Sequence, residues 1–321
     1  MNTVYSPQQV AKLAIEALED LKSSDVGITS GITSLDDVML PFRPGELIVV
    51  MGFTSNYKSG FMNWLIKSAI RQCKENEIVI KVTWEDSVEE DTIKWIASDS
   101  DISVTSLIKG DNSTRWNEIM SSYAKRAMTP LWIIGHSNTE SAKESKSRPR
   151  LTMTDVVSAC DHIRSKATDN NYKIKMIALD YLQRIRPDTT DGGTKREQMM
   201  EAVNKAKDLA ISFGCPVILG VQASRQVLER DFKLPRLDDG METSNIEQSS
   251  DKVISLWFPI KSEREGTPIE ALNGLQVTKN MLVCGVLKQK MGEAPVVLPL
   301  YVDPGKNLIA GLDIQRISFD A

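Results

Sequence analysis

The sequence predicts an α/β fold in which a mostly parallel, twisted sheet is flanked by helices. Short β-branched runs alternate with longer helical segments along the 321 residues, a pattern typical of parallel strands joined by crossover helices. The predicted strands are continuous apolar runs, which indicates that both faces of the sheet are covered. The first of these strands leads into a loop that nearly matches a phosphate-binding motif. These observations favour one large domain with a short N-terminal appendage.

Six strands are predicted from apolar, β-branched runs. They span residues 46–52, 77–84, 130–135, 174–181, 216–222 and 251–258. Near the C-terminus, the sequence VVLPLYVDPGKNLIAGLDIQRI predicts a hairpin that turns at residues 303–306. Two polar segments rich in Ser, Thr, Gly or Pro, residues 136–150 and 186–198, are predicted to be exposed loops.

Two helices have clear boundaries in the sequence. The segment 195–214 carries apolar residues at helical spacing and ends at Gly214, which precedes Cys215-Pro216. At the N-terminus, Ser6 as N-cap and Pro7 at the first helical position predict a helix over residues 6–22. Its apolar stripe consists of Val10, Leu13, Ala14 and Leu18 and requires another surface to cover it. We therefore divide the chain into a linker or docking helix, residues 1–26, and a main domain, residues 27–321.

Composition excludes several classes of protein. Apolar residues make up 41% of the chain and charged residues 26%, and no apolar run is long enough to span a bilayer, so we expect a soluble protein without a membrane partner. The net charge of -4 and pI of about 5.5 mean that any nucleic-acid contact depends on local Lys and Arg residues. The cysteines and histidines lack metal-ligand spacing, and we interpret all six as structural: Cys73, Cys160, Cys215, Cys284, His136 and His162.

The loop MGFTSNYKSG, residues 51–60, follows a predicted strand and precedes a predicted helix. It places Gly52, Lys58 and Ser59 in register with G-x-x-x-x-G-K-[ST], but Tyr57 stands where the second glycine belongs. In such a loop, successive backbone N–H groups bind phosphates, the lysine adds a positive charge and the serine hydroxyl ligates Mg²⁺. We therefore expect ATP and Mg²⁺ as ligands, with these candidate nucleotide-binding residues: Gly52, Thr54, Ser55, Asn56, Tyr57, Lys58 and Ser59.

Two carboxylates at predicted strand ends extend this site. Asp180 ends an apolar strand, where a Mg²⁺-holding carboxylate belongs in nucleoside triphosphatases, although a strand-end aspartate also caps turns. Glu85 ends another strand and could polarise the attacking water as a general base. Alternatively, Glu85 is a solvated carboxylate among the acidic residues that follow it: Asp86, Glu89, Glu90 and Asp91.

Several segments together resemble the RecA-like motor domain of DnaB-type replicative helicases, in one order from residue 27 to about residue 293. GITSGITSLDDVM is similar to the segment that begins this domain, MGFTSNYKS to its phosphate loop, and VTWEDS to its catalytic-glutamate strand. ALDYLQ resembles the Mg²⁺ strand, and the segment from REQMMEAVNKAKDLA to VILGVQASR resembles a helix and the strand bearing a phosphate-sensing glutamine, here Gln222. NIEQSSDKVISL and LKQK follow in the expected order.

The resemblance implies a RecA-like P-loop NTPase core over residues 27–321 and a hexameric ring with ATP between neighbouring subunits. It places single-stranded DNA in the central channel, and it implies a separate primase or other replication proteins as partners. The linker helix would dock on the adjacent subunit. Lys290, with Lys288 beside it, would reach the neighbour's γ-phosphate, and candidate DNA contacts are Arg196, Arg225 and Glu242. The expected location is the cytoplasm of a bacterial or phage-infected cell.

The chain departs from the family pattern at four points. Tyr57 replaces a loop glycine; if it strains the loop, Tyr57→Gly binds ATP at least as tightly. Met241 and Ser244 stand where the family offers an arginine and a glycine in a DNA-contacting loop. Lys290 replaces an arginine and lacks its bidentate fork. Only some 26 residues precede the motor segment, without a collar or primase domain.

Three hypotheses for function follow. The first is an ATP-driven ring translocase or helicase on single-stranded DNA, supported by the complete set of loop, carboxylate and glutamine residues. The second is a nucleotide-binding assembly factor that loads or regulates a helicase, supported by the altered loops. The third is a recombination filament ATPase of the wider RecA-like class, which DYLQ and IEQ disfavour.

Overall fold

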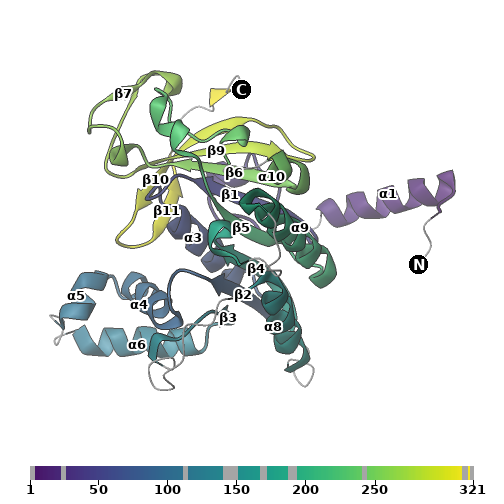
Figure 1. The fold of residues 1–321 in the computed structure, drawn as a ribbon, viewed down its shortest axis with the longest axis horizontal. Coiled ribbons are helices and arrows are strands. Elements are labelled where there is room, and N and C mark those ends of the chain that lie inside the picture. Colours follow the sequence, from purple (N-terminus) through teal and green to yellow (C-terminus); the bar gives the residue numbers. More distant parts are fainter. Residues whose placement is uncertain are drawn as a thin grey trace.

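The computed structural model describes residues 4–22, 27–110, 115–139, 151–166, 172–186, 194–240, 244–312 and 317–318. A ten-stranded sheet runs through the centre, helices cover both of its faces, and a smaller group of helices, α4 to α6, lies beside one end (Figure 1). The strand order is β11-β10-β9-β6-β1-β5-β4-β2-β3, and β12 (Ile317–Ser318) pairs with β10. The mostly parallel α/β architecture predicted from the sequence is confirmed.

All six predicted strands are confirmed, and they form the parallel part of the sheet. Each lies within about a residue of its predicted bounds. They are β1 (Leu47–Gly52), β2 (Glu77–Thr83), β3 (Leu131–Ile134), β4 (Lys173–Asp180), β5 (Val217–Gln222) and β6 (Lys252–Trp257). Because all six run in one direction, their carboxyl ends meet at one edge of the sheet.

The remaining strands of the sheet are antiparallel and follow β6. They are β9 (Met281–Gln289), β10 (Val296–Asp303) and β11 (Leu308–Gly311), and the hairpin between β10 and β11 confirms the predicted turn. A separate two-stranded sheet consists of β7 (Pro268–Ile269) and β8 (Leu275–Gln276).

Helices bury apolar stripes on both faces of the sheet. On one face α3 (Lys58–Arg71) and α2 (Thr33–Asp36) pack against alternate strand residues such as Val50; on the other, α8 (Met153–Lys166) and α9 (Lys195–Phe213) pack against Val49 and its equivalents. The other helices are α4 (Val88–Asp99), α5 (Val104–Lys109), α6 (Trp116–Ala127) and α10 (Ser244–Ser249). Short 3-10 turns are η3 (Leu182–Arg184), η4 (Arg225–Glu229), η5 (Leu237–Asp239), η6 (Pro259–Lys261) and η7 (Glu270–Leu272).

Helix α9 corrects one predicted loop. Thr194 and Glu197 form a reciprocal capping box, which satisfies free N–H groups of the first turn, so the helix begins at Lys195. Residues 195–198, assigned also to the loop 186–198, are therefore helical. Gly214 ends α9 in the left-handed conformation (φ 59°), as its position predicts. Residues 140–150 and 187–193 of the two predicted loops lie outside the described residues.

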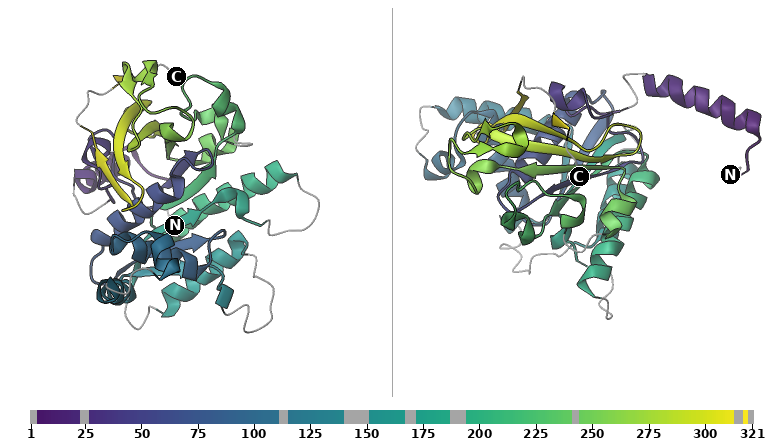
Figure 2. Two further views of the ribbon diagram at one scale, coloured as in Figure 1. Left: turned by 90° about the vertical axis from the view of Figure 1, so that its left-hand side faces the viewer. Right: turned by 90° about the horizontal axis from the view of Figure 1, so that it is seen from above.

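Helix α1 (Pro7–Lys22) begins as predicted, with Ser6 as its N-cap. The Gln9 N–H donates to Ser6 Oγ (3.3 Å), and the Ser6 N–H donates to Gln9 Oε1 (2.8 Å). The helix extends away from the sheet in all three views (Figure 1; Figure 2). Val10, Leu13 and Leu18 are 54%, 48% and 54% exposed, so nothing in the described part of this chain covers the stripe.

The cysteines are free, and three of them are deeply buried. Burial raises the pKa of the Cys160, Cys215 and Cys284 thiols to about 12, which keeps them protonated at neutral pH. Among the described residues, no three His, Cys, Asp or Glu side chains are grouped so that they could hold a metal ion. No helix in the described ranges is both long and apolar enough to cross a bilayer.

Candidate nucleotide site

The loop between β1 and α3 occupies the carboxyl edge of the parallel strands. β1 ends at Gly52, where a Cβ atom would stand 3.4 Å from the Leu256 carbonyl oxygen, and α3 begins at Lys58. Between them Ser55 (φ 66°) and Tyr57 (φ 61°) adopt the left-handed conformation. A non-glycine residue held there costs on the order of 1–3 kcal/mol, so surrounding contacts must stabilise this loop.

Asn56 supplies one of those contacts from inside the loop. Its side chain is buried, its Oδ1 accepts a hydrogen bond from the Phe258 N–H (2.7 Å), and its Nδ2 donates to the Thr54 carbonyl (3.3 Å). Of the candidate nucleotide-binding residues, Asn56 therefore points into the protein and joins the loop to the end of β6. Its side chain does not line the cavity in front of the loop.

The cavity in front of the loop has a volume of about 340 Å³, within the range of small-ligand sites. Most predicted site residues line it: Thr54, Ser55, Tyr57, Lys58, Ser59, Glu85 and Gln222, together with Phe53, Gly60 and Tyr181. Lys58 Nζ lies 4.2 Å from the centre of the Tyr181 ring. Burial lowers the pKa of the Lys58 ammonium, while the charges of Asp180 and Glu85 oppose that shift. An anion in the cavity would satisfy this partly desolvated cation.

Gln222 lies directly beside the loop because it pairs with Gly52 across β1 and β5. Its Nε2 donates to Thr54 Oγ1 (2.7 Å). Gln183 fixes the Gln222 backbone from the other side: its Oε1 accepts from the Gln222 N–H and its Nε2 donates to the Gln222 carbonyl, both at 3.1 Å. The glutamine side chain is thus positioned by two strands, and it borders the cavity.

Asp180 and Ser59 border a second cavity, of about 390 Å³, on the other side of Tyr57. The Asp180 Oδ1 atom is buried and has no hydrogen-bond partner among the described residues. Such an oxygen requires a cation or a water molecule. A carboxylate and a hydroxyl beside a phosphate loop are ligands suited to Mg²⁺, so these residues fit the metal predicted from the sequence.

Glu85 follows β2 and is exposed at the mouth of the first cavity. Arg184 lies 3.7 Å from it, and both side chains are more than half exposed. An exposed ion pair of this kind contributes little to stability, about 0–1 kcal/mol, so Glu85 can exchange this partner for water without disturbing the fold.

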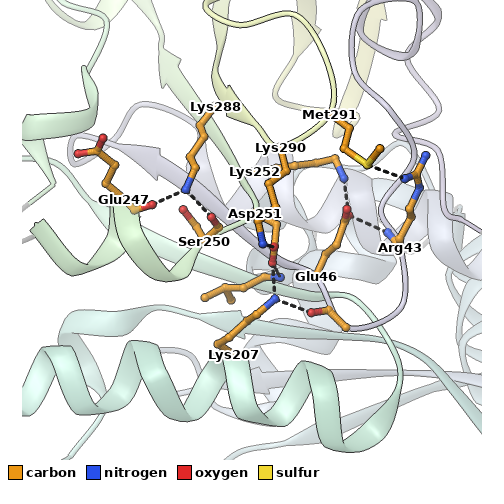
Figure 3. Close-up of polar contacts among 12 residues, drawn as sticks. Arg43, Glu46, Lys207, Glu247, Ser250, Asp251, Lys252, Lys288, Lys290 and Met291 are labelled. Carbon is orange, nitrogen blue, oxygen red and sulfur yellow. Dashed lines mark hydrogen bonds and ion pairs between the residues drawn. The ribbon is translucent and has the colours of Figure 1, made fainter. Parts of the chain in front are cut away.

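Lys288 and Lys290 lie at the opposite edge of the sheet from the loop (Figure 3). Lys288 donates to the carbonyl oxygens of Glu247 and Ser250, while Lys290 Nζ lies 3.0 Å from Asp251 Oδ1. Asp251 stands at the amino end of β1, where its N–H donates to the Leu47 carbonyl. β1 from there to Gly52 spans roughly 16 Å, so neither lysine borders the phosphate cavity of its own chain.

The candidate DNA-binding residues occupy different positions. Arg196 lies in the first turn of α9 and Arg225 in the turn after β5; both are exposed near the carboxyl edge of the sheet. Glu242, like Met241, lies outside the described residues.

Sequence reasoning missed four residues that shape the site. Tyr181 lies under the Lys58 ammonium and Gln183 holds Gln222, and both belong to the quoted DYLQ segment. Gly60 provides space for the Tyr57 ring, and Asn307 accepts the Tyr57 hydroxyl. Only the Gly60 signal, a glycine inside a predicted helix, was visible in the local sequence.

The fold and the site together define a protein of the RecA-like phosphate-loop class. Residues 27–297 match the family described as DnaB-like helicase C terminal domain, so the chain belongs to that family. The chain is 23% identical to the replicative DNA helicase DnaB of Geobacillus stearothermophilus over 244 residues, 76% of this chain and 50% of that protein. It is 22% identical to the replicative DNA helicase DnaC of Bacillus subtilis (strain 168) over 289 residues, 90% of this chain and 57% of that one.

The chain thus spans about half the length of these relatives. Among solved structures, one of an isolated ATPase domain superposes with a TM-score of 0.78 at 18% identity, covering 97% of this chain and all of that one. A DnaB-like replicative helicase studied with primase gives 0.77 at 18% identity, covering 97% and 68%. These similarities confirm the RecA-like fold predicted from the sequence.

We expect Asn56→Ala to destabilise the protein, because it leaves the buried Phe258 N–H without an acceptor. An unsatisfied buried donor costs about 1–3 kcal/mol. The free energy of unfolding, measured in urea, should fall by that amount. Ser55→Ala, at the neighbouring exposed position, is the matched control and should change it by less than about 0.5 kcal/mol. Equal stability of Asn56→Ala and wild type would show that Asn56 does not hold the loop.

Proposed function

We propose that this chain is the ATP-hydrolysing motor of a replicative DNA helicase that translocates on single-stranded DNA. The observation that carries the proposal is the convergence of Lys58, Ser59, Glu85 and Gln222 on one cavity in a chain of this family. Membership in the family favours this hypothesis over an assembly factor or a recombination filament ATPase.

Each residue would have a defined role in hydrolysis. The loop N–H groups and Lys58 would bind the phosphates of ATP, and Ser59 and Asp180 would hold Mg²⁺, which neutralises phosphate charge when bound. Glu85 would accept a hydrogen bond from the attacking water and orient it. Gln222, joined to Thr54 of the loop, would respond to the terminal phosphate.

We propose that Lys290 acts on ATP bound by a neighbouring subunit. Lys290 is 69% exposed and lies at the amino edge of the sheet, whereas its own loop lies at the carboxyl edge. A ring that places one subunit's amino edge against the next subunit's loop would bring the two together. Lys288, held by two carbonyl groups, would support the same strand end.

The N-terminal helix supplies a second argument for a ring, which we propose to be hexameric. We assign residues 1–26 to a docking helix and residues 27–321 to the ATPase domain. The exposed stripe of α1 requires a partner, and α6 presents exposed apolar side chains on one face at helical spacing: Trp116, Met120 and Tyr123. We propose that α1 of one subunit packs on α6 of the next.

We propose that DNA contacts come from Arg196 and Arg225, with Glu242 in the adjacent loop. Both arginines follow strands whose carboxyl ends form the nucleotide edge, so DNA and ATP could influence each other through β5. Phosphate contacts of this kind are independent of sequence and weaken with salt. A separate primase is the proposed protein partner.

Lys58→Ala should weaken ATP binding by about 100-fold, because a charged hydrogen bond to phosphate contributes about 1.5–3 kcal/mol. Isothermal titration calorimetry with ATP and Mg²⁺ measures the change. Lys125→Ala removes the same charge from exposed α6 and is the control. Equal ATP affinity in wild type and Lys58→Ala would refute the assignment of the site.

Removal of residues 1–26 should shift the protein from a ring towards monomer in sedimentation velocity. Met120→Glu should have the same effect, because it places a charge on the proposed receiving surface. Ile211→Glu, an exposed apolar position on α9, is the matched control and should leave the assembly unchanged. An unaltered oligomer after truncation would mean that α1 packs elsewhere.

Lys290→Ala should bind ATP normally but hydrolyse it at least about tenfold more slowly, since a trans-acting arginine contributes ~10³–10⁵ in rate and a lysine part of that. Mixing Lys290→Ala with Lys58→Ala should restore activity, because some interfaces then combine an intact loop with an intact lysine. Lys279→Ala, another exposed lysine, is the control. Mixtures without recovery at any ratio would exclude catalysis between subunits.

A further inference from the structure

Tyr57 occupies a glycine position, yet three contacts fix its side chain in one place. The hydroxyl donates to Asn307 Oδ1 (2.8 Å), in the turn between β10 and β11. The ring packs at a tilt of 53° against Phe258, with 6.1 Å between ring centres. A Cβ atom on Gly60 would stand 2.5 Å from the ring, so only glycine at position 60 leaves room for it. The left-handed tyrosine is therefore an organised part of the loop.

The hydroxyl that binds Asn307 remains a donor at all relevant pH values. Burial raises the pKa of Tyr57 well above its usual range, and the carboxylate of Asp303 adds to the shift. Asn307 is itself left-handed (φ 46°), a conformation that asparagine tolerates better than most residues. The phosphate loop is thus joined to a turn 250 residues away in the sequence.

The fixed ring separates two cavities. The first, about 340 Å³, contains the phosphate-binding groups; the second, about 390 Å³, lies beyond the ring. Tyr57, Ser59 and Gly60 line both. The second cavity is completed by Trp95 and by the turn containing Asn307, together with polar groups such as Asn63. It therefore offers aromatic and hydrogen-bonding surface close to the phosphates.

We propose that the nucleoside of a bound triphosphate lies against the Tyr57 ring in this second cavity, so that Tyr57 determines affinity for nucleotides over bare polyphosphate. The proposal rests on the function proposed above, which places the phosphates on the other side of the ring. A ligand whose phosphates occupy the loop must pass Ser59 and Gly60 to leave it, and these residues border the second cavity. A rigid aromatic ring provides contact area for a ribose or base at low entropic cost.

The test compares ATP with inorganic tripolyphosphate, each with Mg²⁺, by calorimetry on the full chain. Tyr57→Gly should weaken ATP binding about tenfold or more, the size expected when an aromatic contact to a base is lost. Tripolyphosphate affinity should stay the same or rise, because the left-handed position is then relaxed. Tyr57→Phe keeps the ring and should retain most of the preference for ATP.

Asn307→Ala releases the ring without changing the loop sequence and should reduce the preference for ATP in the same direction. Asn273→Ala is the matched control, since Asn273 is also left-handed (φ 55°) but lines neither cavity. An unchanged ratio of ATP to tripolyphosphate affinity in both Tyr57→Gly and Asn307→Ala would overturn the proposal and leave the ring as a filler of space. If wild-type protein binds tripolyphosphate but shows no preference for ATP, this inference alone fails. If it binds neither ligand, the proposed function fails with it.

Discussion

The parallel pairing of β1 between β5 and β6 is the constraint on which the rest of the structure depends. It places Gly52 opposite Gln222 on one side and Leu256 on the other, so the turn that leaves β1 starts at a fixed point. Asn56 then connects that turn to Phe258, directly beyond β6. The shape of the phosphate loop therefore follows from buried backbone pairing, which explains how it accommodates left-handed Ser55 and Tyr57.

Local sequence patterns were sufficient for the sheet and for part of the site. Buried strands such as β1 and β5 are continuous apolar runs, and Ser6 and Gly214 are residues whose backbone preferences mark helix ends. Parallel strands bring their carboxyl ends to one edge, so Lys58, Glu85 and Gln222 could be assigned to one site from their positions after strands. The boundary of α9 was less clear, because polar Lys195 and Arg196 suit either a loop or a capped first turn.

Other features depend on contacts between distant residues and leave no local pattern. Nothing near Tyr57 in the sequence indicates that Asn307 accepts its hydroxyl, and nothing near Gln222 indicates that Gln183 holds its backbone. The inward orientation of Asn56 has the same origin, since its neighbours on either side face the cavity. In β9, the register shift opposite Val253 and Ile254 alters the alternation before Lys288, and pleat arithmetic alone does not reveal it.

The charge cluster at the amino edge of the sheet has an asymmetric construction. Burial alone would raise the pKa of Asp251, and its hydrogen bonds to Lys207, Leu47 and Lys290 together lower it. Lys207 and the Leu47 N–H approach one oxygen, and Lys290 approaches the other from solvent. If Lys290 turns away, the carboxylate retains a cation and a backbone donor, so no buried charge is left uncompensated. Lys290 is therefore a detachable counterion, whose transfer to a foreign anion leaves the charge balance of the fold intact.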